Sequence, residues 1–244
     1  MAEIRDDRLF QQPDESHWGE CPLCCLPLPL DSNKLSFHTC CCKIICQGCE
    51  YADFLRARQE GLDSRCAFCR EPMQKNKAKT EKNWMDRIKA NDPVAIRERG
   101  KKCYREGDYE GAFEYYKKAA ELEDIDAHYN LSTMYHEGQG VERDLKKKVY
   151  HLEEAAIGGH PQARYNIANH EIRNRRYERA MKHYIIAAKL GDDVASEKVK
   201  SGFALGIVSK EDYEAALRGH QAAVDATKSK QRDEAYQVFQ QFQN

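Results

Sequence analysis

The residues of this chain with the clearest capacity for chemistry are its cysteines. The sequence of 244 residues holds eleven, and ten of them fall between Cys21 and Cys69. Three pairs have the form Cys-x-x-Cys, and a run of three consecutive cysteines stands between Cys24 and Cys46, so the ligand candidates form four groups along the chain. Each Cys-x-x-Cys pair presents two thiolates to one tetrahedral ion, at metal–sulfur distances of about 2.3 Å. The ligand candidates, in chain order, are Cys21, Cys24, Cys40, Cys41, Cys42, Cys46, Cys49, Cys66 and Cys69.

The N-terminal sequence indicates whether these thiols are to be interpreted as metal ligands or as partners in disulfide bonds. It has no apolar secretory segment, so we expect a reducing compartment, cytoplasmic or nuclear, where clustered cysteines bind metal. Eight ligands suffice for two four-coordinate zinc ions. A segment of about 50 residues buries little core, and structural zinc supplies roughly 10–16 kcal/mol per site in small peptides. The cysteines therefore predict two structural Zn²⁺ ions.

The order and spacing of the cysteines resemble the RING finger family over Cys21–Pro72. That family has Cys-x2-Cys, a long loop, a close ligand pair, Cys-x2-Cys, a second loop and a final Cys-x2-Cys. The resemblance implies a small cross-braced domain with two zinc ions, in which the first and third pairs share one ion and the middle and last pairs share the other. The implied first set is Cys21, Cys24, Cys46 and Cys49, and the second set is the middle pair with Cys66 and Cys69.

The middle pair departs from the usual family pattern, in which a histidine follows a cysteine. No histidine lies between Cys40 and Cys46, so the chain resembles an all-cysteine variant. Cys40 takes one ligand place, and Cys41 and Cys42 are alternatives for the other, because each fits a spacing that the family allows. His38 is a further alternative that we expect to be a loop residue.

Two other readings bear on this segment. Cys25 adjoins a ligand position and is expected to be a spare thiol. A PHD finger also interleaves two zinc ions, but it needs a histidine near position 46 and a tryptophan at position 64, where this chain has Cys46 and Ser64. The RING pattern fits better.

The RING resemblance implies ubiquitin-protein ligase activity. Such domains dock a ubiquitin-charged conjugating enzyme and orient its thioester, with no covalent intermediate on the ligase. Leu23 occupies the position of an apolar contact for the conjugating enzyme, and Arg70 that of the basic residue that contacts ubiquitin. Pro72 completes the common ending, whereas Ala67 replaces a frequent proline and weakens the docking reading.

The remaining chain repeats from Pro93 onward. Ala95, Ala127, Ala163 and Ala195 recur at steps of 32, 36 and 32 residues, a period typical of helical solenoids. The segment Tyr135–Val141, with its two glycines, resembles the turn of a Sel1-like repeat of the tetratricopeptide (TPR) class. The expected fold is thus a small cross-braced two-zinc RING domain followed by an all-α Sel1/TPR-like solenoid, with repeats at about 93–124, 125–160, 161–192 and, degenerate, 193–228.

Three segments flank these domains. We expect a flexible lead over residues 1–20, a charged linker or connecting helix over 73–92, and a polar helix or tail over 229–244. Cys103 falls within a repeat helix and is expected to be a small buried side chain. The 39 basic and 40 acidic residues nearly cancel, which argues against a nucleic-acid partner, and no segment is apolar enough to predict a membrane span.

The sequence thus predicts a RING-type ubiquitin ligase whose repeats bind a protein substrate or partner. The alternative is a non-enzymatic, zinc-binding scaffold that mediates protein–protein interactions. The pair Leu23 and Arg70 favours the ligase, while Ala67 and the unusual middle ligands favour the scaffold.

Overall fold

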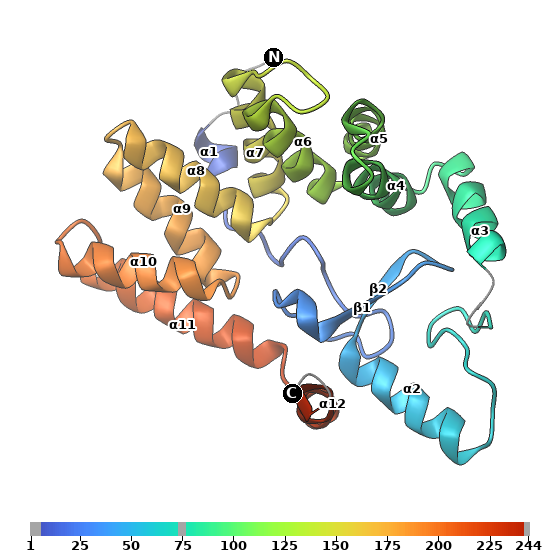
Figure 1. Cartoon of the computed structure of the whole chain (residues 1–244). Helices are drawn as coiled ribbons and strands as arrows, with labels where there is room; N and C mark the ends of the chain where they lie inside the picture. The colour runs from blue at the N-terminus through green and yellow to red at the C-terminus, as the bar shows by residue number, and fades with distance from the viewer. Residues whose placement is uncertain (1–5, 73–76, 242–244) are drawn as a thin grey trace. The chain divides into compact units, whose positions relative to one another are not determined.

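A computed structural model describes residues 6–72 and 77–241 of the chain (Figure 1). The chain divides into two compact units. The repeat unit comprises Met1–His17 and Ile96–Ala223, and the cysteine unit comprises Trp18–Ala95 and Val224–Asn244. Both units are therefore assembled from segments that are far apart in sequence.

The repeat unit is built from antiparallel helix pairs that follow one another along the chain. Each expected repeat holds one pair, and neighbouring pairs pack together in order. Asp124, Asp144 and Asp192 begin their helices by accepting backbone N–H bonds, which satisfies donors that the first turn leaves free. The helices are α4 (Pro93–Arg105), α5 (Tyr109–Glu121), α6 (Ile125–Glu137), α7 (Leu145–Ile157), α8 (Pro161–Arg173), α9 (Tyr177–Lys189), α10 (Asp193–Ala204) and α11 (Lys210–Ala226).

Small residues at fixed positions let the helices of the repeat unit approach closely. Of the recurring alanines found in the sequence, Ala127, Ala163 and Ala195 lie in this unit and are fully buried, and Ala95 at the end of the neighbouring segment is fully buried too. Cys103 is 4% exposed and packs with Tyr116 and Leu131, as expected for a small apolar core residue. The buried stripe of each helix thus serves packing between neighbouring helices.

The cysteine unit is organised around a short hairpin. Strands β1 (Leu35–His38) and β2 (Lys43–Cys46) pair antiparallel, with Leu35 opposite Cys46 and His38 opposite Lys43. A 3-10 turn, η1 (Ser32–Lys34), leads into β1, and α2 (Gln47–Gln59) begins directly after β2. The hairpin therefore carries the cysteine triplet on its turn and one Cys-x-x-Cys pair where β2 meets α2.

Two flanking segments form helices in the cysteine unit. Of residues 73–92, positions 73–76 lie outside the described residues, and α3 (Lys77–Lys89) makes the connecting helix of the two expected alternatives. Its Arg87 donates to the carbonyl oxygen of Cys40 over 3.1 Å. Of residues 229–244, α12 (Lys230–Gln241) is helical and packs against α2, and 242–244 lie outside the described residues.

The expectation of a flexible lead is corrected for residues 6–20. Asp6–Leu9 forms the short helix α1, and Leu9 is 1% exposed within the core of the repeat unit. Glu20 bridges to Pro27 within the cysteine unit. The segment is polar in composition, but it contains the apolar pair Leu9-Phe10. Packing of this pair, with Leu9 buried, holds the segment against the repeat unit. Residues 1–5 lie outside the described part of the chain.

Candidate metal centres

The first cluster of thiols combines the first and third cysteine pairs. A turn closes around Cys21, whose carbonyl accepts from Cys25 N–H over 2.8 Å, and it directs the thiols of Cys21 and Cys24 to one side. Cys46 ends β2 and Cys49 lies in the first turn of α2. The four Sγ atoms all lie within 4.8 Å of one another. Segments 25 residues apart thus present four thiols to one point.

The second cluster combines cysteines of the hairpin turn with the last pair. It contains Cys40, Cys41, Cys66 and Cys69, again with all four Sγ atoms within 4.8 Å of one another. The turn of the last pair is closed by Arg70 N–H, which donates to the Cys66 carbonyl over 3.0 Å. The two clusters interleave along the chain: pairs one and three meet at one point, and pairs two and four at the other.

The dimensions of both clusters suit a tetrahedral zinc ion. Four sulfurs at about 2.3 Å from a central ion lie about 3.8 Å apart. The observed Sγ–Sγ distances are 3.9 Å for Cys21–Cys49 and 3.8 Å for Cys24–Cys46. In the second cluster they are 3.8 Å for Cys41–Cys66 and 3.4 Å for Cys40–Cys69. No described cysteine forms a disulfide, which would need sulfurs about 2.05 Å apart.

The protonation of these thiols bears on how a metal would enter. Burial raises the pKa of Cys41 to about 11 and that of Cys49 to about 12. Both thiols therefore hold their protons near neutral pH without metal, and a bound Zn²⁺ would have to displace them.

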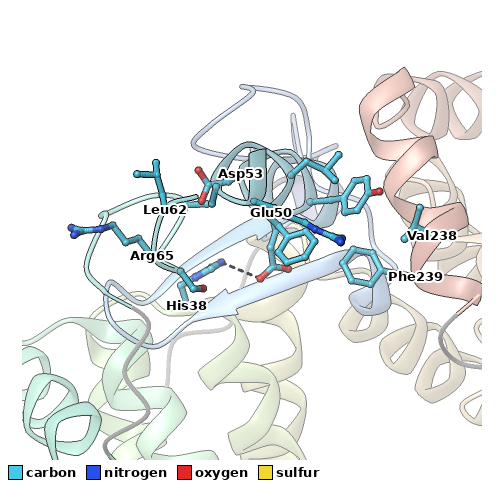
Figure 2. Close-up of a pocket in the computed structure, with 14 residues that line it drawn as sticks. His38, Glu50, Asp53, Leu62, Arg65, Val238 and Phe239 are labelled. Carbon is cyan, nitrogen blue, oxygen red and sulfur yellow. Dashed lines mark ion pairs between the residues drawn. The ribbon is translucent and has the colours of Figure 1, made fainter. Parts of the chain in front are cut away.

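The geometry separates the alternatives that the sequence left open. The thiol of Cys41 lies in the second cluster, whereas Cys42 has a φ of 52° and its Sγ lies 3.9 Å from the Thr39 carbonyl oxygen. His38 is likewise outside the cluster: its Nε2 lies 3.7 Å from a carboxylate oxygen of Glu50 (Figure 2). Cys25 is exposed and belongs to neither cluster.

The two residues expected to contact a conjugating enzyme and ubiquitin lie on the surface of the cysteine unit. Leu23 is 40% exposed. Arg70 has a left-handed backbone with a φ of 61°, and its guanidinium forms an ion pair with Asp53 of α2 over 2.5 Å. Arg56 pairs with the same carboxylate over 2.7 Å. The exposed Arg70 side chain is therefore tied to α2 by this ion pair.

Arg232 of α12 is a residue near the first cluster that the sequence did not indicate. Its guanidinium donates to the carbonyl oxygens of Pro27 and Leu26, over 2.7 and 3.1 Å, and approaches Cys24 Sγ to 3.3 Å. Gly48 permits this approach, because a Cβ there would lie 2.9 Å from Arg232 Cγ. A buried positive charge beside four thiolates would offset part of the net charge of a zinc–tetrathiolate centre.

A pocket of about 620 Å³ lies on the cysteine unit, and Ala67 of the last Cys-x-x-Cys pair is among its lining residues (Figure 2). Its wall is formed by α2, by the loop before the last cysteine pair and by α12. Phe54 and Leu62 contribute exposed apolar surface, at 56% and 54%, and Phe239 lies on the α12 side. Apolar side chains from α2, from the loop before the last cysteine pair and from α12 thus line part of this pocket.

A third group of potential ligands lies in the repeat unit. His17 and His160 place Nε2 atoms 3.2 and 3.5 Å from the same carboxylate oxygen of Asp126, and the two rings stack with centroids 4.3 Å apart. The Arg97 guanidinium already pairs with the other oxygen of Asp126. Because this cation neutralises the carboxylate, we interpret the group as packing of the N-terminal segment against the repeat 125–160 rather than as a metal site.

Comparisons with known proteins identify the repeats. A model of the Sel1 repeat matches residues 94–124, 125–160 and 172–192. Over 56 residues the chain is 39% identical to "Putative beta-lactamase HcpC" of Helicobacter pylori (strain J99 / ATCC 700824), covering 23% of this chain and 19% of that protein. The chain thus spans about a fifth of the length of this relative.

Two crystal structures are similar to the chain in fold. A Sel1 repeat protein from Oxalobacter formigenes has a TM-score of 0.51 at 24% identity, covering 74% of this chain and 72% of that one. The protein c5321, a protective antigen of uropathogenic Escherichia coli with an SLR fold, has a TM-score of 0.50 at 20% identity, covering 66% and 41%. The chain therefore carries Sel1 repeats, and the predicted all-helical Sel1/TPR-like solenoid is confirmed. No helix among the described residues has the length and apolar character needed to cross a membrane.

Proposed function

We propose that this protein is a zinc-stabilised scaffold, whose cysteine unit folds around two Zn²⁺ ions while its Sel1 repeats bind a partner protein. The observation that carries the proposal is the pair of interleaved four-thiol clusters, each of a size that suits one tetrahedral ion. Bound zinc would tie Cys21–Cys24 to the start of α2 and the hairpin turn to the last cysteine pair. Such ions add folding free energy to a small unit with little apolar core.

The repeats supply the binding surface of this scaffold. Stacked helical repeats bury one stripe of side chains and expose an extended face to other proteins. Leu145 and Tyr177, which begin α7 and α9, are 51% and 48% exposed, and Tyr109 at the start of α5 is 37% exposed. These equivalent positions form a series of apolar side chains at one end of successive repeats, which supports partner binding there.

Metal content tests the zinc half of the proposal. Freshly purified full-length protein should carry about two zinc ions per chain. Cys24→Ser should lower this to about one, whereas Cys25→Ser, which changes the exposed thiol next to it, should leave the content unchanged. Folded protein with almost no zinc would contradict the proposal.

Partner capture tests the binding half. A partner retained by the wild-type protein should be lost by the double variant Leu145→Ser/Tyr177→Ser. It should be kept by Leu205→Ser, which removes a side chain that is 75% exposed but lies outside this series. Equal capture by all three proteins would contradict binding at the repeats.

A ubiquitin ligase is a second candidate function, favoured by the interleaved thiol clusters and by the exposure of Leu23. The cysteine unit would then dock a ubiquitin-charged conjugating enzyme and act by positioning its thioester. The test is ubiquitin-chain formation with activating enzyme, a panel of conjugating enzymes and ATP. Leu23→Ala or Arg70→Ala should slow it by about tenfold. Arg56→Ala, which alters the other partner of Asp53, should not. If no conjugating enzyme gives such a product, the ligase candidate is wrong and the scaffold stands.

A further inference from the structure

The first described residues of the chain occupy an apolar site among the repeat helices. Leu9 at the end of α1 packs with Leu152 of α7 and with Ala163 and Ile167 of α8. It is 1% exposed, and α1 lies beside α7 (Figure 1). A segment that is not part of any repeat therefore supplies a core side chain to two of them.

Arg164 of α8 contacts the backbone of this segment rather than its side chains. The guanidinium donates to the carbonyl oxygen of Leu9 and, over 3.2 Å, to that of Gln11. Arg164 is fully buried, and this burial lowers its pKa to about 10. Its paired donors reach carbonyls two residues apart, an arrangement that accepts the main chain of a peptide whatever its side chains.

Side-chain recognition comes from α9. Arg179 and Lys182 lie over the ring of Phe10, at 4.8 and 5.4 Å from its centroid, and the His183 ring lies 4.7 Å away. Arg179 also forms an ion pair with Asp6, which raises the pKa of Arg179. The site thus contacts an acidic side chain together with an aromatic side chain four residues later.

The segment does not fill the site. A cavity of about 400 Å³ remains beside Asp6 and Leu9, between α7, α8 and α9. Glu153, His170 and Arg176 also line it. Space next to the segment therefore remains unfilled.

We propose that the surface of α7, α8 and α9 is a peptide-binding site that residues 6–12 occupy in cis. Its partner is a protein segment of the same chemistry: an acidic residue, two further residues, then leucine and an aromatic residue. The N-terminal segment competes with that partner, so release of the segment makes the repeats available. This inference rests on the proposed function, in which the repeats bind proteins, and it adds a second binding surface beside the exposed starts of α5, α7 and α9.

A labelled peptide of residues 6–17 tests the proposal against the full-length protein by fluorescence anisotropy. Leu9→Glu weakens the cis segment and keeps the site, so this variant should bind the peptide about tenfold more tightly than wild type. Adding Arg179→Gln to Leu9→Glu should reverse this gain. Lys198→Gln, an exposed substitution on α10, should not, and a scrambled peptide should not bind.

Equal affinity of wild type and Leu9→Glu for the peptide would overturn the proposal, as would equal binding of the scrambled peptide. If Leu9→Glu does not fold by circular dichroism, Phe10→Ala takes its place with the same two outcomes. The capture experiment with Leu145→Ser/Tyr177→Ser uses the whole partner and a different set of side chains. A peptide that fails to bind therefore refutes the peptide site and leaves the scaffold function to its own test.

Discussion

At the scale of single residues, the choice between Cys41 and Cys42 gives a matched pair of substitutions. The Cys41 thiol lies 3.8 Å from that of Cys66, whereas Cys42 points toward the Thr39 carbonyl. Cys41→Ser should therefore lower the zinc content by about one ion per chain, and Cys42→Ser should leave it unchanged. Metal analysis of the two purified variants decides, and the reverse pattern would assign the ligand to Cys42.

The positive charge of Arg232 lies next to the first thiol cluster, although Arg232 is about 200 positions away from Cys24 in sequence. It donates to main-chain oxygens of Leu26, Pro27 and Thr227, so replacing it removes three charge-assisted hydrogen bonds between partly buried groups. Arg232→Gln should lower the free energy of unfolding of the cysteine unit by about 1–3 kcal/mol and speed zinc loss to a chelator. Lys230→Gln, which is exposed on the same helix, is the control. Unchanged zinc release in Arg232→Gln would show that α12 does not support the metal centre.

These two residues mark what the sequence could and could not predict about the site. Ligand spacing is local, so the Cys-x-x-Cys pairs could be read directly from the sequence. The choice between Cys41 and Cys42 depends on the backbone of the hairpin turn, where Cys42 takes a φ of 52°. Arg232 could not be predicted at all, because its role depends on α12 packing against α2, a contact between distant segments of a polar sequence.

At the scale of elements, Gly140 fixes the contact between successive repeats. It has a φ of 67°, and a Cβ there would lie 2.2 Å from the Tyr109 carbonyl oxygen at the start of α5. Gly140→Ala should lower the free energy of unfolding of the repeat unit by about 2–4 kcal/mol, since backbone strain and a steric clash add. Chemical denaturation measures the change.

Gly107 provides the control for this prediction. It has a φ of 84°, but a Cβ there would meet nothing within 4 Å. Gly107→Ala therefore carries the backbone strain without the clash, and should cost about 1 kcal/mol. Equal losses of unfolding free energy in both variants would show that the close approach of α5 to the Gly140 turn does not affect the stability of the repeat unit.

The elements of the repeat unit were predictable because the same packing problem recurs. Ala127, Ala163 and Ala195 occupy equivalent buried sites, so the period of 32 to 36 residues appears directly in the sequence. Residues 6–12 lack such a period. Their place in the repeat unit depends on Arg164 and on the apolar site around Leu9, which a reading of local composition does not reveal.

At the scale of the whole molecule, acid should act on the repeat unit through its buried histidines. Burial, reinforced by the charges of Arg164 and Arg179 and opposed by Asp6, lowers the pKa of His183 to about 3. The unfolded chain, with a histidine pKa near 6.5, then binds more protons than the folded one between pH 6.5 and 3. The contribution of such a histidine to the free energy of unfolding of the repeat unit is therefore fully present above about pH 6.5. It falls as the pH drops, by up to about 1.4 kcal/mol per pH unit for each such histidine.

A histidine substitution separates this effect from general acid unfolding. His183→Phe removes the titrating group and keeps an aromatic ring beside Phe10, so the variant should show a shallower loss of stability between pH 6.5 and 4. His220→Gln, which changes a histidine that pairs with exposed Asp193, should keep the wild-type slope. Denaturant midpoints across this pH range measure the stability of both variants. If stability depends on pH with the same slope in wild type and both variants, His183 does not cause the loss of stability in acid.

Metal removal should act on the other unit. The cysteine unit has few large buried apolar side chains, and the interleaved thiol clusters hold its hairpin, α2 and last cysteine pair together, whereas the repeat unit has an extended apolar core. A strong chelator at pH 7.5 should therefore abolish hydrogen-exchange protection in β1, β2 and α2 and leave that of α6 to α9 intact. At that pH His183 is neutral in folded and unfolded chains alike, so acid and chelator address different units. Simultaneous loss of protection in the cysteine unit and the repeat unit would mean that the repeats depend on zinc for their fold. The proposal of a scaffold with two independently stabilised units would then be wrong.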